Sequence, residues 1–192
     1  MEIGRLSARA VIGGLFIGHG TQKLFGWFGG PGLEGTEQMM GALEMRPTRP
    51  NALAAGLSES VGGALLVLGA ATPAAAASLI GTMVTAIRKV HKPNGPWVAQ
   101  GGWEYNAVLI AALTALIDAG PGDISVDALI GRKEWGPAWA VGGLGVGVAA
   151  SVAAVALGRR GGSAAAGSPS GDDEVVQATA DDTAGDPVTA TS

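Results

Sequence analysis

Five long apolar segments constrain the fold of this 192-residue chain more than any other feature. They occupy about 6–28, 52–71, 73–90, 103–117 and 139–157. Each approaches the roughly 20 apolar residues that an α-helix needs to cross the hydrocarbon core of a bilayer. Only 15% of the residues are charged, whereas soluble domains carry about 25%. The sequence therefore predicts an all-α integral membrane protein whose surroundings are a lipid bilayer.

The connections and the C-terminal end add to this prediction. Thr72-Pro73 leaves room for only a tight turn between the second and third segments, and proline is well tolerated in the first turn of a helix. We therefore expect these two helices to form an antiparallel hairpin. The chain after Gly161 is rich in Ala, Gly, Ser, Thr and Asp. Such a composition buries too little apolar surface to offset the entropy of ordering, so we expect a disordered tail.

Glycines inside the segments indicate close helix packing. The pairs Gly14/Gly18 and Gly143/Gly147 have the GxxxG spacing that lets two helix backbones approach each other in lipid. The Gly-x-Gly-x-Gly sequence at 143–147 is not expected to bind a nucleotide, because no strand precedes it.

The composition excludes several kinds of site. The chain has no cysteine, which excludes disulfides, thiol chemistry, Cys-ligated iron–sulfur clusters and zinc–thiolate sites within it. We expect no metal site. Basic residues form no patch of the kind that binds nucleic acid, so no nucleic acid partner is expected.

Polar residues gather at the ends of four segments that should lie on one face of the membrane. Because successive spanning helices alternate in direction, the first and third end on this face, and the second and fourth begin there. We call it face B, and the N-terminal side face A. The residues concerned are His19, Gln22, Lys23, Glu59, Arg88, Lys89, His91, Glu104, Tyr105 and Asn106. The sequence thus predicts one polar site built by four helices.

Depth makes His19 and Glu59 the main candidates. His19 precedes Phe28 by nine residues, or about 13 Å along a helix, and Glu59 follows Asn51 by eight residues, or about 12 Å. Ionisable groups at such depth are expensive and usually functional. A carboxylate in lipid should be paired or protonated, and Lys23, Arg88 or His19 can be the partner of Glu59.

Most of these residues also have a purely structural interpretation. Lys23, Lys89 and Lys92 are long basic side chains near helix ends, which often extend toward the lipid head groups. His91 lies in a loop-like Lys-Pro-Asn-Gly setting typical of a plain surface. His19 and Glu59 can form a buried structural pair.

Several short motifs resemble those of the DoxX family of small bacterial membrane proteins. The most specific is His-Gly-Thr-Gln-Lys-Leu-Phe-Gly-Trp-Phe-Gly-Gly-Pro-Gly at 19–32, followed by Gly35-Thr36. The others are Gly-Leu-Ser-Glu at 56–59, Gly62-Gly63, Leu68-Gly69, Thr72-Pro73, Glu104-Tyr105-Asn106, and Gly-Pro-Gly at 120–122 with Ser125 and Asp127. The resemblance covers about 5–130.

The resemblance implies a multi-pass protein of the bacterial plasma membrane with a four-helix bundle as its core. We place this core at 1–118 and a polar loop at 119–136. A fifth transmembrane helix at 137–158 and a disordered acidic tail at 159–192 are additions to it. The family name links it to the DoxD-type subunit of archaeal thiosulfate:quinone oxidoreductase, which implies redox chemistry near the quinone pool.

The leading functional hypothesis is a quinone-linked oxidoreductase component. Its catalytic residues are expected to be His19 and Glu59, and its candidate substrate- or quinone-binding residues are Gln22, Lys23, Arg88, His91, Glu104, Tyr105 and Asn106. We expect no covalently bound cofactor. Quinone is the expected bound cofactor, and a soluble or membrane redox partner, or the substrate itself, would supply the electrons.

The alternative is a non-enzymatic membrane scaffold or small transporter that docks a partner enzyme. In that case the polar cluster holds helices together or lines a permeation path. A pure assembly role, in which changes at His19 and Glu59 affect stability alone, also remains open.

Overall fold

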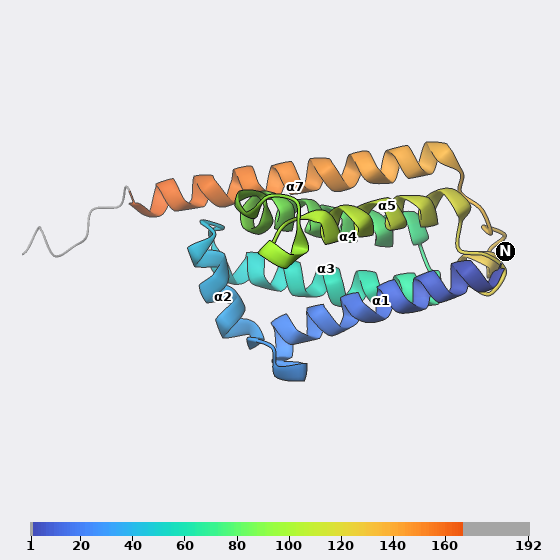
Figure 1. Ribbon diagram of the computed structural model, residues 1–192, viewed down its shortest axis with the longest axis horizontal. Coiled ribbons are helices and arrows are strands. Elements are labelled where there is room, and N and C mark those ends of the chain that lie inside the picture. Colours follow the sequence, from blue (N-terminus) through green and yellow to red (C-terminus); the bar gives the residue numbers. More distant parts are fainter. Residues whose placement is uncertain (1, 167–192) are drawn as a thin grey trace, which may run out of the picture. The chain divides into compact units, whose positions relative to one another are not determined.

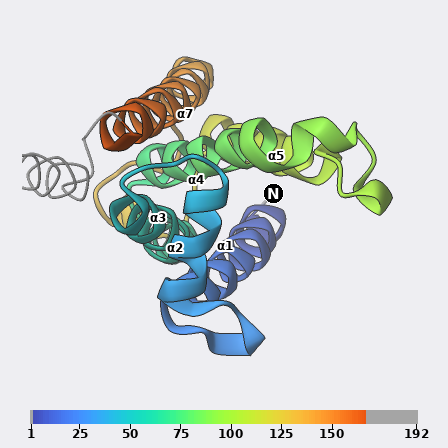
Figure 2. The same ribbon diagram turned by 90° about the vertical axis from the view of Figure 1, so that its left-hand side faces the viewer.

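The computed structural model describes the backbone of residues 2–166 and the side chains of residues 2–160. Within this range all regular elements are helices, so the all-α prediction is confirmed. Four of them pack side by side along a common direction, namely α1 (Glu2–Phe25), α3 (Thr48–Leu68), α4 (Thr72–Ala86) and α5 (Glu104–Ala119) (Figure 1). A further long helix, α7 (Pro137–Ala166), lies beside α4 on the outside of this group (Figure 2).

Shorter elements join these helices. They are the 3-10 turn Trp27–Gly29, α2 (Gly32–Ala42), the π-helical turn Ile87–His91, the 3-10 turns Lys92–Asn94 and Val98–Gln100, and α6 (Val126–Leu129). The α3–α4 connection is as short as Thr72-Pro73 suggests. Gly69 ends α3 in the left-handed conformation, with φ of 62°, and α4 begins at Thr72 with Pro73 in its first turn.

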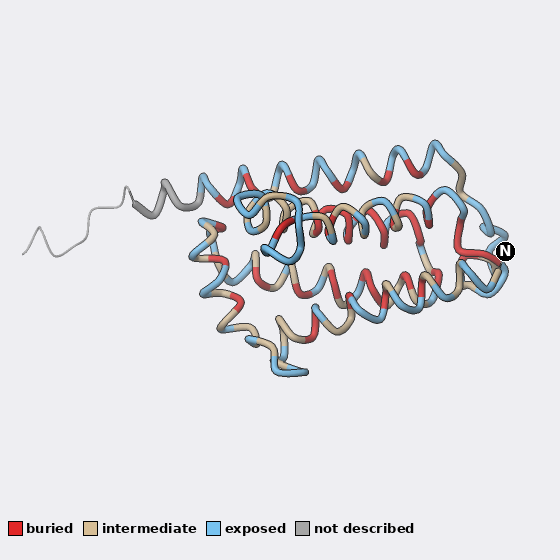
Figure 3. The backbone as a smooth tube through the Cα atoms, in the orientation of Figure 1, coloured by how far each residue is buried: buried red, intermediate tan, exposed pale blue. Residues whose placement is uncertain are grey.

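The buried residues of the four packed helices lie mainly on the sides where these helices face one another (Figure 3). The large side chains of this core are Phe16, Leu66, Leu79, Ile80, Met83, Leu113, Leu116 and Ile117. The outward faces are apolar as well, with Val11, Leu15, Leu57, Val61, Val108, Val141, Val146 and Val152 all exposed. Because soluble monomers rarely expose apolar surface on this scale, the distribution favours lipid surroundings.

Two described helices, α3 and the Pro137–Arg160 part of α7, are long and apolar enough to cross a membrane. The other three expected spans are more charged or shorter than these two helices. Helix α1 contains four charged residues, and α4 and α5 have 15 and 16 residues before the chain leaves regular α-helix.

Glycines bring α1 and α3 into close contact, but not through the expected pair. A Cβ on Gly13 would lie 2.6 Å from the carbonyl oxygen of Gly63, and one on Gly20 would lie 2.5 Å from the amide nitrogen of Ser60. By contrast, Gly14 and Gly18 have no other atom in reach of an added Cβ. The Gly14/Gly18 packing prediction was therefore wrong, because the GxxxG spacing does not reveal which side of the helix meets a neighbour.

The second GxxxG prediction was right. A Cβ on Gly147 would lie 2.8 Å from the carbonyl oxygen of Ala77 on α4, and one on Gly143 would lie 2.6 Å from Ile117 Cδ1 on α5. These two glycines therefore let α7 approach the four packed helices closely.

The glycine contact between α1 and α3 gives a matched test. We expect Gly20→Ala to lower the unfolding free energy by about 1–3 kcal/mol, since the added methyl group overpacks against Ser60. Gly18→Ala adds the same methyl group to open space, where alanine's better helix propensity should raise stability by up to about 1 kcal/mol. Thermal unfolding of both variants in a neutral detergent measures the difference. Equal effects would show that the α1–α3 contact is not as close as described.

Helix α2 was not expected from the sequence and lies across the face B end of the helices (Figure 1). It buries Thr36 and Met40, one turn apart, against α1 and α3. The Thr36 hydroxyl donates a hydrogen bond to the carbonyl oxygen of Gly32 at 2.7 Å and approaches that of Lys23 at 3.1 Å. This contact holds α2 against the end of α1.

The C-terminal helix also differs from its expected boundary. It was expected to end at 158, but α7 continues through Arg159 and Arg160 to Ala166. The start of the expected acidic tail is therefore helical. The rest of that tail, 167–192, lies outside the described residues.

At face A, a buried arginine ties three parts of the chain together. Arg9 is 2% exposed. Its guanidinium donates hydrogen bonds to the carbonyl oxygens of Leu66 and Val67, at the end of α3, and of Pro121 and Ile124, in the loop after α5. An arginine fork can serve several acceptors at once in a way that a lysine cannot.

The same loop supplies a cap for α4. The buried carboxylate of Asp127 accepts hydrogen bonds from the amides of Ala71 at 2.7 Å and Thr72 at 2.9 Å. A carboxylate at a helix N-terminus satisfies amide groups that have no partner within the helix. Arg9 and Asp127 together fix the face A ends of α1, α3 and α4.

Candidate functional site

A cavity of about 620 Å³ lies at face B, inside the ring of helix ends that the sequence predicts. It is lined by the end of α1, the start of α3, the end of α4 and the start of α5, and also by α2 and α7. Its volume falls within the range of about 300–1,000 Å³ that is typical of sites for small organic ligands. Most of its lining side chains are apolar, and a few polar groups converge on it.

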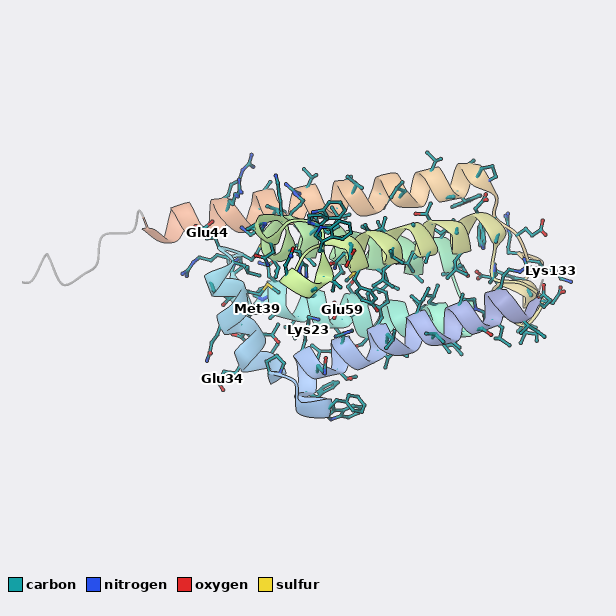
Figure 4. The ribbon with its side chains drawn as sticks, viewed as in Figure 1. Lys23, Glu34, Met39, Glu44, Glu59 and Lys133 are labelled. Carbon is teal, nitrogen blue, oxygen red and sulfur yellow. The ribbon has the colours of Figure 1, made fainter. Side chains whose placement is uncertain are left out.

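A buried ion pair forms the most polar part of the wall. Lys23 Nζ on α1 lies 2.5 Å from Glu59 Oε2 on α3, and the Glu59 side chain is 4% exposed (Figure 4). Among the three partners considered for Glu59, the structure selects Lys23. Glu59 faces α1 because Gly56 and Gly63, on the same side of α3, allow close contact with Leu24 and Gly13. The charge-assisted hydrogen bond neutralises a carboxylate that would be costly alone.

Two of the lining side chains mark an opening. His19 on α1 and Tyr105 on α5 are exposed although both line the cavity, and so is Leu15, one turn before His19. The cavity therefore opens to the outside between α1 and α5. A histidine ring and a phenol at this opening can donate and accept hydrogen bonds and exchange protons.

The π-helical turn that ends α4 contributes Lys89, Val90 and His91 to the lining. His91 Nδ1 lies 2.7 Å from the carbonyl oxygen of Gly101. Because a carbonyl only accepts, Nδ1 carries the proton in this contact and Nε2 is left to interact elsewhere. Such π turns are rare and often occur at functional sites.

Polar side chains deeper in the wall are bonded to one another. Ser58 Oγ and Thr82 Oγ1 lie 3.0 Å apart, which joins α3 to α4. Thr85 donates a hydrogen bond to Ser151 of α7 at 2.9 Å. The buried amide of Asn106 on α5 lies 3.3 Å from Met83 Sδ. These contacts give the cavity a fixed wall between helices that are distant in sequence.

The structure brings six of the nine predicted site residues to this cavity and places three elsewhere. The six are His19, Lys23, Glu59, His91, Tyr105 and Asn106. Gln22 lies outside the lining, and Arg88 is exposed. Glu104 instead accepts a hydrogen bond from the amide of Val98 at 2.7 Å, and so stabilises the loop before α5.

Sequence reasoning missed three sets of lining residues. Lys89 was grouped with the polar helix ends of face B but not with the candidate binding residues. Helix α2 adds Met39 and Met40, and α7 adds Ala150, Ser151 and Ala154. The 3- and 4-residue spacing of Leu33, Thr36, Met40 and Leu43 is a helical signal for α2, whereas nothing in the sequence of α7 indicates which of its faces meets the cavity.

The comparison with known protein families matches the part of the chain that contains four of the six predicted residues at the cavity. Residues 4–92 match the model of the DoxX family, which includes His19, Lys23, Glu59, Lys89 and His91. The motifs from Glu104 onward, which also suggested the resemblance, lie outside the matched residues. No curated protein and no solved structure matches the chain. The match over residues 4–92 supports a DoxX family protein, and the apolar helices support its membrane character.

Proposed function

We propose that this protein is a multi-pass protein of the bacterial plasma membrane and works as a quinone-linked oxidoreductase component. In this proposal α1, α3, α4 and α5 form a four-helix membrane core, and α7 is an added fifth span. The apolar outward faces of α1, α3, α5 and α7 support this arrangement. The single observation that carries the functional part is the cavity with the buried Lys23–Glu59 pair.

The cavity offers what a quinone site needs from a protein. A quinone ring is flat and apolar, and its two carbonyl oxygens accept hydrogen bonds. The lining supplies apolar surface from Phe16, Leu109 and Met83, and donors from Lys23 and Tyr105. When bound, quinone would supply the electron-accepting chemistry, since the chain's own side chains carry out no redox reaction of this kind.

In this proposal the residues of the chain bind the ring and move protons. Glu59 and His19 are the candidate catalytic residues, with the Glu59 carboxylate accepting a proton from the ligand inside the cavity and His19 exchanging protons at the opening. Lys23 positions Glu59 through the 2.5 Å hydrogen bond. Asn106, held by its contact with Met83, and Tyr105 orient the ligand from α5.

The test is electron transfer from a supplied donor to a quinone analogue by purified protein in proteoliposomes. Glu59→Gln keeps the size of the side chain and a hydrogen-bond acceptor but removes the titratable group. We expect it to lower the rate of quinone reduction by about 100-fold or more, as loss of a positioned acid–base group typically does. Protein level and unfolding temperature are measured beside the rate.

Glu37→Gln is the matched control. Glu37 lies on α2, pairs with Arg49 at 3.0 Å, and does not line the cavity. It should leave the rate unchanged. Normal turnover in Glu59→Gln would contradict the redox proposal, and would favour the alternative of a scaffold or small transporter.

A further inference from the structure

The ammonium group of Lys89 is enclosed but poorly neutralised. Its side chain is 11% exposed and lines the cavity. Its Nζ lies 3.9 Å from Glu44 Oε2, which is too long for a hydrogen bond. Lys23 is bonded to Glu59 at 2.5 Å, so the two cations of the lining differ sharply. Among the described residues, no acceptor lies within hydrogen-bond distance of Lys89 Nζ.

The partner of Lys89, Glu44, lies at the surface of the protein. Glu44 follows α2 in the left-handed conformation, with φ of 56°, and its side chain is 80% exposed. It does not line the cavity. Figure 4 shows Glu44 toward one end of the molecule, Lys23 and Glu59 nearer its middle, and Lys133 at the opposite end. A solvated carboxylate at this distance is a weak counter-ion that a better anion can replace.

The surroundings of Lys89 favour a ligand that is apolar elsewhere. The lining includes Ile12, Leu15, Phe16, Met40, Leu43 and Leu109. An enclosed ammonium beside apolar surface is costly unless an anion pairs with it. The π turn presents Lys89 and His91 to this space together, and π turns are often found at binding sites.

We propose that the cavity binds an amphiphile with an anionic head group, either a carboxylate or a phosphate, and an apolar chain. Lys89 binds the head group and gives up its contact with Glu44. The apolar lining between α1 and α5 holds the chain. This assignment follows from the charge and burial of Lys89 and does not depend on the redox proposal, although a quinone and this amphiphile would compete for the same space.

The probe is oleate, with oleyl alcohol as its uncharged counterpart of the same chain. Native mass spectrometry of the full chain, released from a neutral detergent after co-purified lipid has been removed, measures retention directly. We expect the protein to retain oleate more strongly than oleyl alcohol. Lys89→Met should weaken oleate retention about tenfold, the effect of losing one hydrogen bond to a charged group, and Lys89→Arg should preserve it.

Glu44→Gln gives a change in the opposite direction, which a folding defect would not produce. Removing the competing carboxylate should tighten oleate retention about two- to fivefold, the worth of an exposed ion pair. Glu37→Gln, which removes a carboxylate of α2 that pairs with Arg49 instead, should change nothing.

The same retention measurement with phosphatidylglycerol as the probe distinguishes a free fatty acid from a bilayer lipid as the source of the head group. Retention that depends on Lys89 supports the proposal in either case, and it identifies a free fatty acid or a bilayer lipid according to which probe shows it. Equal retention of oleate and oleyl alcohol, unchanged in Lys89→Met and Glu44→Gln, would overturn the proposal. These measurements involve no electron transfer, so a failure here is distinct from a failure of the quinone assay.

Discussion

Replacing Arg9 with methionine should lower the unfolding free energy by about 3–5 kcal/mol, one of the two largest single-residue effects that we expect. Methionine fills much of the same volume but donates no hydrogen bond. The carbonyl oxygens of Leu66, Val67, Pro121 and Ile124 would then lose a charged donor at the same time. Thermal unfolding in a neutral detergent, followed by circular dichroism, should show a fall of roughly 10 °C or more.

Two further variants separate charge from geometry at this position. Arg9→Lys restores the charge, but a single ammonium cannot reach acceptors on both α3 and the loop after α5, so it should recover less than half of the loss. Arg49→Met removes an exposed arginine whose side chain is 66% accessible and pairs with Glu37. It should cost at most about 1 kcal/mol. If Arg9→Met unfolded like Arg49→Met, the network would not be what holds face A together.

The second large effect is expected at the buried ion pair. Lys23→Met leaves the Glu59 carboxylate 4% exposed and without its cation, which should cost about 3–5 kcal/mol. Glu59→Gln should cost less, about 1–2 kcal/mol, because Lys23 is 21% exposed and can turn toward water. The measurement is again the unfolding free energy of each variant in the same detergent.

The double variant Lys23→Met/Glu59→Gln completes the cycle. It removes both charges, so it should be more stable than Lys23→Met alone, with a coupling of about 1–3 kcal/mol between the two positions. Additive losses would mean that the contact between Lys23 and Glu59 contributes little, and the cavity wall would then depend on packing alone. Gly18→Ala, measured in the same detergent, shows whether this assay can resolve a change in unfolding free energy as small as about 1 kcal/mol.

Much of the arrangement could be predicted because lipid restricts the choices available to a chain. Long apolar segments must become helices, and alternating directions then place the end of α1 beside the start of α3. This logic predicts that His19, Glu59 and Tyr105 meet at one site, and all three line the cavity. The pairing of Glu59 could also be predicted, because burying an isolated carboxylate in lipid is energetically unfavourable.

The remaining details could not be predicted because they depend on rotation about helix axes and on local backbone geometry. The GxxxG spacing of Gly14 and Gly18 does not reveal which side of the helix meets a neighbour. The contact with α3 uses Gly13 and Gly20 instead. Lys89 lines the cavity whereas Arg88, the preceding residue of the π turn, is exposed, because adjacent residues of a helix point to different sides. Nothing in the sequence near Arg9 indicates its structural role, since its acceptors come from residues more than fifty positions away.

The opening between α1 and α5, bordered by Leu15, His19 and Tyr105, has a consequence for how any ligand reaches the cavity. Helix α2 lies across the face B ends of α1 and α3, and the opening between α1 and α5 faces sideways, so it admits a ligand from the side. A molecule entering from the side arrives by diffusion in two dimensions, from a phase in which apolar compounds are strongly enriched. Occupancy should therefore follow the mole fraction of ligand in the bilayer, and dilution with lipid, rather than with buffer, should empty the site.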